Sequence, residues 1–300
     1  MVKQLFAAAA CAAALGCAPS TDEEAAPADS AAETLDPSSQ HLDEILSALP
    51  EDAIARIPYR NPKETLAFFG VEPGMTVVDT VPGDIWYTHI LARYLGPDGT
   101  VIGADRPLSV WEWFGPDYSP PEFLEERKSW PTTWTAKQTE IHGTDGPAFE
   151  AFVFGSAPES LTGSVDVVMV IREMHNMIAA DESSALVENM LAEVHAMLAP
   201  NGVFGIIQHR AQEDAPDSWA NGANGYLKQS ALVALVGANG FALEAASEIN
   251  ANPKDRPTDG EAVWRLPPAL YGSEEDDALR DAMLAIGESD RMTLKFRKVE

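Results

Sequence analysis

The chain has 300 residues and a net charge of −27, because 47 acidic side chains stand against only 20 lysines and arginines. This length suits one sizeable α/β domain or two small ones. The charge argues against a nucleic-acid-binding protein, since phosphate neutralisation needs clustered cations, and it leaves no polybasic patch for anionic lipid. It favours a highly solvated surface, with a cationic partner as the alternative.

The first 16 residues are typical of a bacterial lipoprotein signal peptide. A short start with one lysine precedes an Ala-rich apolar run at residues 5–15, which is too short to span a membrane. The run closes on Gly16-Cys17, where cleavage would leave Cys17 to carry the lipid. We therefore predict export to the periplasm or cell envelope, with membrane contact only through the lipid on Cys17. Ordinary secretion, with cleavage near Pro19, is the alternative.

Residues 17–40 predict a disordered acidic tether, and residues 41–300 a single folded domain. The tether is rich in Ala, Pro, Ser and acidic residues and has no basic residue, so it cannot bury a core. Cys11 and Cys17 are the only cysteines. Once Cys17 is lipidated, the mature chain has no thiol, which excludes disulfides, thiolate metal sites and cysteine nucleophiles.

Helix and strand patterns alternate along the folded part. A helical segment at residues 41–55, broken at Pro50, precedes a helix that Asn61 caps, Pro62 starts and Gly70 ends. Further helices are expected at residues 85–95, 181–198 and 229–237. Strands are expected at residues 75–79, 100–104, 137–141, 165–171, 203–208, 241–249 and 292–297.

This alternation predicts an α/β fold: a Rossmann-like, seven-stranded, mostly parallel sheet with helices on both faces and its last two strands antiparallel. Residues 107–134 fit neither period and hold four of the seven tryptophans and five prolines. We interpret them as an irregular insertion. Its tryptophans form a lid or an aromatic pocket for an apolar substrate, or else fill the core; they are Trp111, Trp113, Trp130 and Trp134.

The loop after Asp79 is the first candidate site, because ligands of such a sheet bind outside the carboxyl ends of the strands. A dinucleotide-binding G-x-G-x-x-G loop has three glycines, whereas this loop has only Gly83. Pro82-Gly83 suits a type II turn with the glycine at positive φ. Asp84 then falls at a helix N-terminus, where a carboxylate favours a cation and repels phosphate. A dinucleotide therefore does not fit this loop.

S-adenosylmethionine suits this acidic edge better, because it has no phosphate and carries a sulfonium and an ammonium group. Asp105 ends the second predicted strand, where an acidic residue commonly holds ribose hydroxyls. The alternative is that Asp79 and Asp105 only terminate strands and cap loops.

Distinctive segments run along residues 56–299. They are NPKETLAFFGVEPGMTVVD, the turn from Pro82 to Thr88, ILARYLGPDGTVIGAD, the segment from Arg172 to Asn176, QHRA from Gln208 to Ala211, SEINANPKD and IGESDRMTLKF. In these segments the chain resembles a family of exported class I methyltransferases of bacteria. The resemblance implies the seven-stranded fold, S-adenosylmethionine as cofactor and a small-molecule substrate. The cofactor contacts that it implies are Asp79, Pro82, Gly83, Asp84, Tyr87, Asp105 and Arg172.

The chain departs from the family pattern at Asp84 and Ile85. Relatives carry glycines at these positions, whereas here side chains occupy the space of the cofactor's methionine portion. Two functions follow: a S-adenosylmethionine-dependent methyltransferase acting on an unidentified small molecule, or a catalytically impaired methyltransferase-fold binding protein anchored in the cell envelope. A metal-assisted enzyme is a third alternative, but no short His/Asp ligand spacing supports it, and no metal site is expected.

The ends of the two central strands carry the candidate catalytic residues His175, Asn176, His209 and Arg210. We expect the histidines to face one pocket, where one acts as general base, since a pKa of about 6.5 suits neutral pH. Arg172 or Arg210 can hold a carboxylate, and Asn176 would lie beside the methyl acceptor. The alternative is that both histidines hydrogen-bond loop backbone. Residues 250–255 and 287–291 would cover this site; the alternative is that they only form two conformationally demanding turns.

Overall fold

The computed structural model describes residues 37–83, 86–143, 145–181 and 185–300. The predicted signal peptide, Cys17 and most of the tether lie outside these residues, as do Asp84 and Ile85. The first helix, α1 (Pro37–Ser47), includes the last four residues of the predicted tether. In the part of the chain that is described, no helix is both long enough and apolar enough to cross a membrane.

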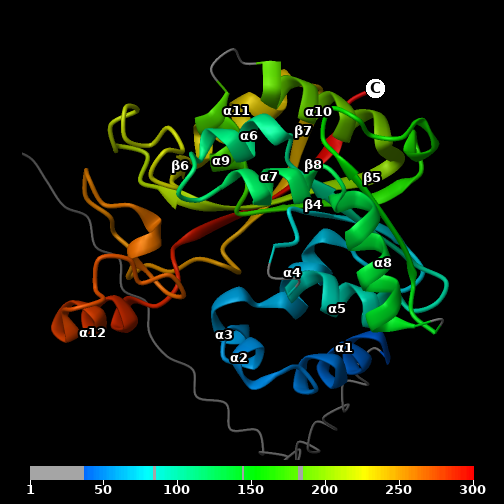
Figure 1. Cartoon of the computed structure of the whole chain (residues 1–300), viewed down its shortest axis with the longest axis horizontal. Coiled ribbons are helices and arrows are strands. Elements are labelled where there is room, and N and C mark those ends of the chain that lie inside the picture. Colours follow the sequence, from blue (N-terminus) through cyan, green and yellow to red (C-terminus); the bar gives the residue numbers. More distant parts are fainter. Residues whose placement is uncertain (1–36, 84–85, 144, 182–184) are drawn as a thin grey trace, which may run out of the picture. The chain divides into compact units, whose positions relative to one another are not determined.

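A twisted sheet forms the centre of the compact unit that ends at Glu300 (Figure 1). Its described strands are β1 (Thr76–Thr80), β2 (Thr100–Asp105), β3 (Ala148–Val153), β4 (Val165–Ile171), β5 (Leu198–Ala211), β6 (Leu227–Lys228), β7 (Phe241–Ser247) and β8 (Arg291–Lys298). The spatial order is β3-β2-β1-β4-β5-β8-β7, and the short β6 pairs with the end of β5. Strands β1 to β5 run parallel, whereas β8 is antiparallel to both of its neighbours. This confirms the predicted mostly parallel α/β sheet.

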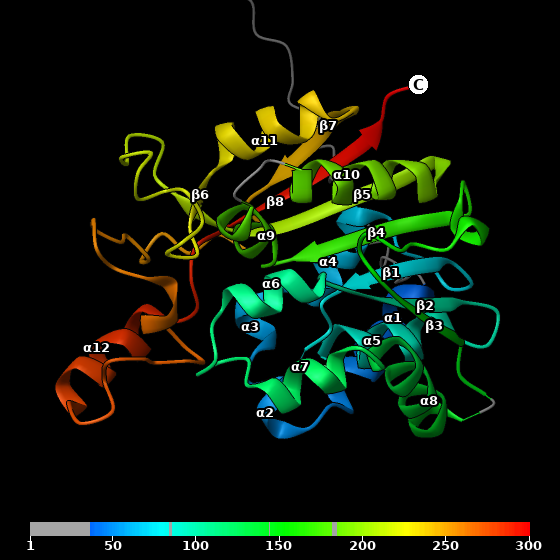
Figure 2. The ribbon, with the colours of Figure 1, turned by 45° about the horizontal axis from the view of Figure 1, so that its top comes forward.

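Helices cover both faces of the sheet because successive strand side chains point to opposite sides. Val77 packs with α1, α4 and α5, whereas its neighbour Val78 packs with α9, α10 and α11. Figure 2 shows these two groups on opposite sides of the strands. The described helices after α1 are α2 (Glu51–Ile54), α3 (Ile57–Arg60), α4 (Pro62–Phe69), α5 (Trp86–Leu95), α6 (Leu108–Trp113), α7 (Pro121–Arg127), α8 (Trp130–His142), α9 (Met174–Ala180), α10 (Ala185–Met197), α11 (Gln229–Ala238) and α12 (Asp277–Ile286).

The segment between β2 and β3 is helical, which corrects two predictions. Residues 107–134 are not irregular, because they contain α6, α7 and the start of α8; residues 137–141 lie in α8 and form no strand. Trp130, Trp134 and Gln138 are spaced four residues apart and therefore share one helix face. Trp134 and Gln138 are buried, and a Cβ on Gly103 of β2 would lie 3.1 Å from the Trp130 and Trp134 rings. The third strand comes later, at β3.

Candidate functional site

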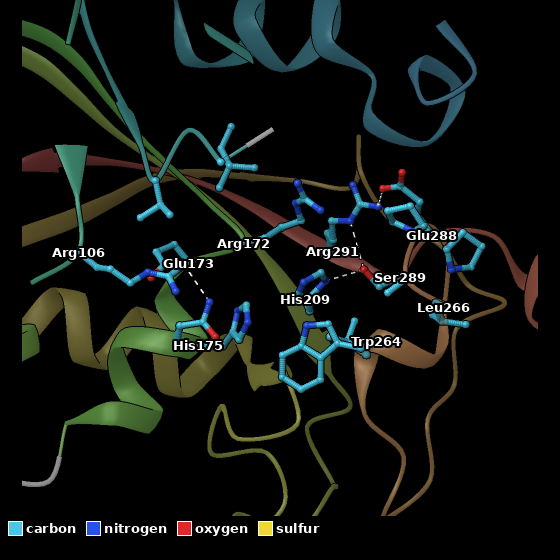
Figure 3. A pocket seen from close by; sticks show the side chains of 18 of the residues that line it. Arg106, Arg172, Glu173, His175, His209, Trp264, Leu266, Glu288, Ser289 and Arg291 are labelled. Carbon is cyan, nitrogen blue, oxygen red and sulfur yellow. Dashed lines mark hydrogen bonds and ion pairs between the residues drawn. The ribbon is translucent and has the colours of Figure 1, made fainter. Parts of the chain in front are cut away.

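The candidate site lies where the strand order reverses, between β1 and β4. Val81 and Arg172 follow these two strands with φ of 49° and 58°, a left-handed conformation that is costly for a β-branched residue such as valine. Their N–H groups donate to the carbonyls of Ala104 and Ile207, each at 2.7 Å. Both residues line a cavity of about 330 Å³ (Figure 3). We call it the polar pocket, lined by Val81, Arg172, Glu173, His175, His209 and Arg291.

The turn after β1 differs from the predicted type II turn. Gly83 does not have a positive φ; Val81 has it instead. The Gly83 N–H donates to the Val81 carbonyl at 2.7 Å, which makes a tight three-residue turn centred on Pro82. The turn comes earlier than predicted because the Val81 N–H still bonds to Ala104, so the chain leaves the sheet directly after it.

His175 and His209 lie together in the polar pocket, with ring centroids 5.3 Å apart. Nδ1 of His209 lies 2.6 Å from Oγ of Ser289, and Nδ1 of His175 lies 3.3 Å from Oε1 of Gln208. Burial, with nearby arginines, lowers the pKa of His175 to about 3 and that of His209 well below its ordinary value. Both imidazoles are therefore neutral at physiological pH, which makes them weak bases but good hydrogen-bonding groups.

Glu173 is a buried ionisable group of the polar pocket that sequence reasoning missed. It is buried, and its Oε2 accepts hydrogen bonds from Arg106 at 2.6 Å and from Nδ2 of Asn176 at 3.0 Å. Oε1 has no hydrogen-bond partner among the described residues. Burial raises the pKa of Glu173 to about 7 although Arg106 opposes the shift. The sequence feature that could have identified Glu173 is a carboxylate in the segment that follows the most apolar strand.

The far side of the polar pocket comes from the residues before β8. Arg60 and Arg291 both pair with Glu288, and Nε of Arg291 donates to Oγ of Ser289 at 3.2 Å. Glu288, Ser289 and Arg291 line the pocket, but no residue of 250–255 does, so only one of the two segments predicted to cover the site borders it. Trp264, with Leu266 and Pro267 next to it, forms an apolar wall that faces the two histidines (Figure 3). A ligand there would meet polar groups on one side and apolar groups on the other.

Asp79, Tyr87 and Arg210 are predicted site residues that line neither the polar pocket nor the cavity next to it. Oδ2 of Asp79 accepts a hydrogen bond from Thr88 at 2.7 Å, so Asp79 is buried against α5. Tyr87 is buried in α5 and borders neither this pocket nor the one described next; burial raises its pKa to about 12. Arg210 pairs with Asp290 and Glu248 on the other side of the β5 end, where it borders a different pocket. Of the two arginines predicted to hold a carboxylate, Arg172 lines the polar pocket and Arg210 does not.

A second cavity of about 530 Å³ adjoins the polar pocket, because Val81, Gly83, Trp111 and Tyr118 border both. We call it the aromatic pocket. Its walls include Trp111, Phe123, Trp130 and Trp134, and Pro82 also lines it. Three of the four predicted tryptophans thus border a pocket, whereas Trp113 is exposed and does not line it. Gln138 borders it too; this side chain is fully buried, and neither its oxygen nor its nitrogen has a hydrogen-bond partner in the described chain.

Asp105 is buried and is bound by Trp111, a residue that borders both pockets. Its Oδ2 accepts hydrogen bonds from Nε1 of Trp111 at 3.2 Å and from Arg127. Arg127 also stacks on the Trp111 and Trp130 rings. Asp105 borders neither pocket. The insertion helices α6 and α7 thus engage Oδ2 of the carboxylate that was predicted to hold ribose hydroxyls, whereas its Oδ1 is buried and has no hydrogen-bond partner among the described residues. The described residues include no cluster of His, Cys, Asp or Glu suited to a metal ion.

Several solved structures are similar to this chain over most of its length. No family model matches the chain, and neither does any curated protein sequence. The cyclase SpnF is 13% identical, with a TM-score of 0.50 over 80% of each chain. A Haloferax volcanii putative methyltransferase, solved with its Trm112 activator, is 18% identical, with a TM-score of 0.49 over 86% of this chain and 98% of its own. A SAM-dependent methyltransferase from Aquifex aeolicus is 16% identical, with a TM-score of 0.44 over 70% of this chain and 93% of its own.

The strand order and the likeness to SpnF show the class I methyltransferase fold. Identities this low show the fold alone. One fold serves many chemistries, and a cyclase is among the neighbours. The residues of the two pockets must therefore decide the function.

Proposed function

We propose that this chain is a S-adenosylmethionine-dependent methyltransferase that acts on a small molecule. The observation that carries the proposal is the pair of adjoining pockets, one aromatic and one polar, at the strand-order reversal of a class I methyltransferase fold. Their volumes lie in the range of small-molecule sites. A transfer between two bound small molecules needs a donor site and an acceptor site that adjoin. Val81 and Gly83 line both cavities and so mark the place where the two sites meet.

The pocket residues fit most of S-adenosylmethionine. The aromatic pocket suits the adenine, because the rings of Trp130 and Trp134 can stack on it and the unpaired amide of Gln138 can hydrogen-bond its edge. Arg172 suits the carboxylate of the methionine portion. Asp105 fits only if its contacts with Arg127 are exchanged for ribose hydroxyls. When bound, the cofactor supplies an electrophilic methyl group.

The protein's own contribution is to position the acceptor. His175 and His209 are neutral and face the same cavity, so they can hold an acceptor by hydrogen bonds while Trp264 packs on its apolar part. Alignment of acceptor and methyl group supplies a large share of the rate in reactions of this kind.

Calorimetric titration of the purified chain with S-adenosylmethionine and S-adenosylhomocysteine tests the proposal. We expect saturable binding of both, weakened at least tenfold in Asp105→Asn if Asp105 holds the ribose. Glu248→Gln, which changes a surface carboxylate away from both pockets, should bind like the unchanged chain. No heat of binding from a folded protein would refute the methyltransferase.

A catalytically impaired binding protein in the cell envelope is the second candidate. The closure of Asp105 by Trp111 and Arg127 favours it, because an unused cofactor site can lose access without loss of fold. On this hypothesis the Arg127→Gln variant would gain no affinity for S-adenosylmethionine. If Arg127 only blocks the ribose site of a working methyltransferase, the same variant should bind S-adenosylmethionine more tightly.

We further propose export and a lipid anchor at Cys17. The support is the apolar run that ends in Gly16-Cys17, followed by the acidic segment without a basic residue. An anchored enzyme or receptor would work at the membrane surface at the end of this tether.

A further inference from the structure

Glu173 carries a buried carboxylate oxygen that nothing in the described chain satisfies. Oε2 is held by Arg106 and Asn176, which fix the orientation of the carboxyl group. Oε1 has no partner, although the side chain is almost completely buried and lines the polar pocket. A buried acceptor left without a hydrogen bond costs about 1–3 kcal/mol. A structural ion pair needs no such oxygen, whereas a ligand that donates a hydrogen bond would use it.

Several charged or titratable groups act on this carboxyl group. Arg106 and Asp105 approach it from the end of β2, and they have opposite effects on its pKa. Arg172 precedes Glu173 directly and His175 follows it by two residues, and His209 faces the pocket from β5. The histidines are neutral because burial lowers their pKa. Glu173 is therefore the pocket group that changes charge near neutral pH, since burial brings its pKa to about 7.

We infer that Glu173 is the proton acceptor of the polar pocket and that the pocket takes a small molecule presenting a hydroxyl or amine hydrogen to Oε1. The inference rests on the proposed function for its chemistry. The O–H or N–H bond of the acceptor breaks, and its proton goes to Oε1 of Glu173. The electron pair left on the oxygen or nitrogen forms the bond to the methyl carbon, while the sulfur takes the electrons of the breaking C–S bond. A base whose pKa lies near the working pH suits this step best.

The companion residues have positioning roles in this scheme. Arg106 is clamped over the Trp111 ring at 4.2 Å, so it holds Oε2 in one place. Asn176, predicted beside the acceptor, lines the polar pocket and also donates a hydrogen bond to Oε2 of Glu173. The predicted general bases His175 and His209 then act as hydrogen-bonding groups around the acceptor.

Phenol and anisole test the inference without knowledge of the natural substrate, because only phenol donates a hydrogen bond. Their affinities for the full chain and for Glu173→Gln would be measured by NMR titration between pH 5.5 and pH 8.5. In the unchanged chain we expect the preference for phenol to rise about tenfold with pH, since a hydrogen bond to an ionised acceptor is the stronger kind. In Glu173→Gln the preference should not depend on pH. Glu248→Gln should behave like the unchanged chain.

Infrared difference spectra between the chain and Glu173→Gln give a second measurement that needs no ligand. The carbonyl stretch of a protonated carboxyl group should disappear with a midpoint near pH 7. A midpoint near the ordinary value of 4.5, or a phenol preference that does not change with pH, would overturn the inference. Binding of S-adenosylmethionine is scored separately. A chain that binds phenol as expected but takes up no cofactor refutes the methyltransferase and leaves Glu173 as the proton acceptor of another reaction.

Discussion

Replacement of Glu173 by glutamine should stabilise the protein at alkaline pH. Glutamine has the shape of a protonated glutamate, so it keeps the contacts of Oε2 with Arg106 in a neutral form. Most substitutions of a buried ion-paired residue destabilise by about 3–5 kcal/mol, because the partner charge is left alone. The opposite sign is expected here, since burial outweighs the attraction of Arg106 and raises the pKa of Glu173.

The magnitude follows from proton linkage. The pKa of Glu173 is 4.5 in its ordinary state and about 7 in the folded chain. Between these values the folded protein keeps a proton that the unfolded chain has lost, so the free energy of unfolding falls as pH rises through this window. At about 1.4 kcal/mol per pH unit the loss is about 3 kcal/mol, and it stays constant above pH 7. Glutamine does not titrate, so Glu173→Gln should match the unchanged chain near pH 4.5 and exceed it by about 3 kcal/mol at pH 8.

Urea unfolding of both proteins at pH 4.5, 6 and 8 measures this difference. Glu288→Gln is the matched control, because that carboxylate pairs with two buried arginines, Arg60 and Arg291. Although burial opposes it, the two arginines lower the pKa of Glu288, so its contribution to stability is present at neutral pH and is lost only as pH falls. Glu288→Gln should therefore destabilise at pH 8. If Glu173→Gln is less stable than the unchanged chain at pH 8, Glu173 is a structural partner of Arg106 and the reasoning is wrong.

Two further changes test the core and the anchor. Gly205→Ala should cost about 1–3 kcal/mol in urea unfolding, because its Cβ would lie 2.9 Å from the buried Phe69 ring; a second change, Phe69→Leu, should restore part of the loss, and a fully stable single variant would contradict this packing. Cys17→Ser should move the protein from the membrane fraction to the soluble fraction of the producing cells, whereas Cys11→Ser should not; membrane retention of Cys17→Ser would rule out the lipid anchor.

The strands were predictable where burial on both faces makes the sequence continuously apolar. Residues 165–171 and 203–208 are strand in the structure for that reason. Helix α8 was missed because its buried face includes the polar Gln138, which interrupts the apolar period that marks a helix. Helix α12 was missed although its sequence is strongly amphipathic, so a helical period was present there without any fully buried side chain.

The site was predictable where topology alone decides position, and not where side-chain contacts decide it. Parallel neighbours end at one edge, so His175 and His209 had to lie close together. Arg210 follows His209 directly and therefore points to the other side, out of the pocket. The Asp105–Arg127 pair depends on how α7 folds back over β2, and a sequence pattern does not specify such a contact.

The insertion between β2 and β3 links the two pockets and must be decisive for function. Trp111 of α6 borders both pockets, donates to Asp105 and lies under the guanidinium of Arg106. Arg106 in turn orients Glu173. Any movement of α6 that frees Asp105 for a ribose would therefore also shift the support of the proposed proton acceptor. Cofactor access and acceptor chemistry are then coupled through Trp111, and a variant that removes only one of its two contacts separates them. Trp111→Phe removes the hydrogen bond to Asp105 but keeps an aromatic ring under Arg106, so it should change cofactor affinity while leaving the midpoint of the Glu173 infrared titration near pH 7.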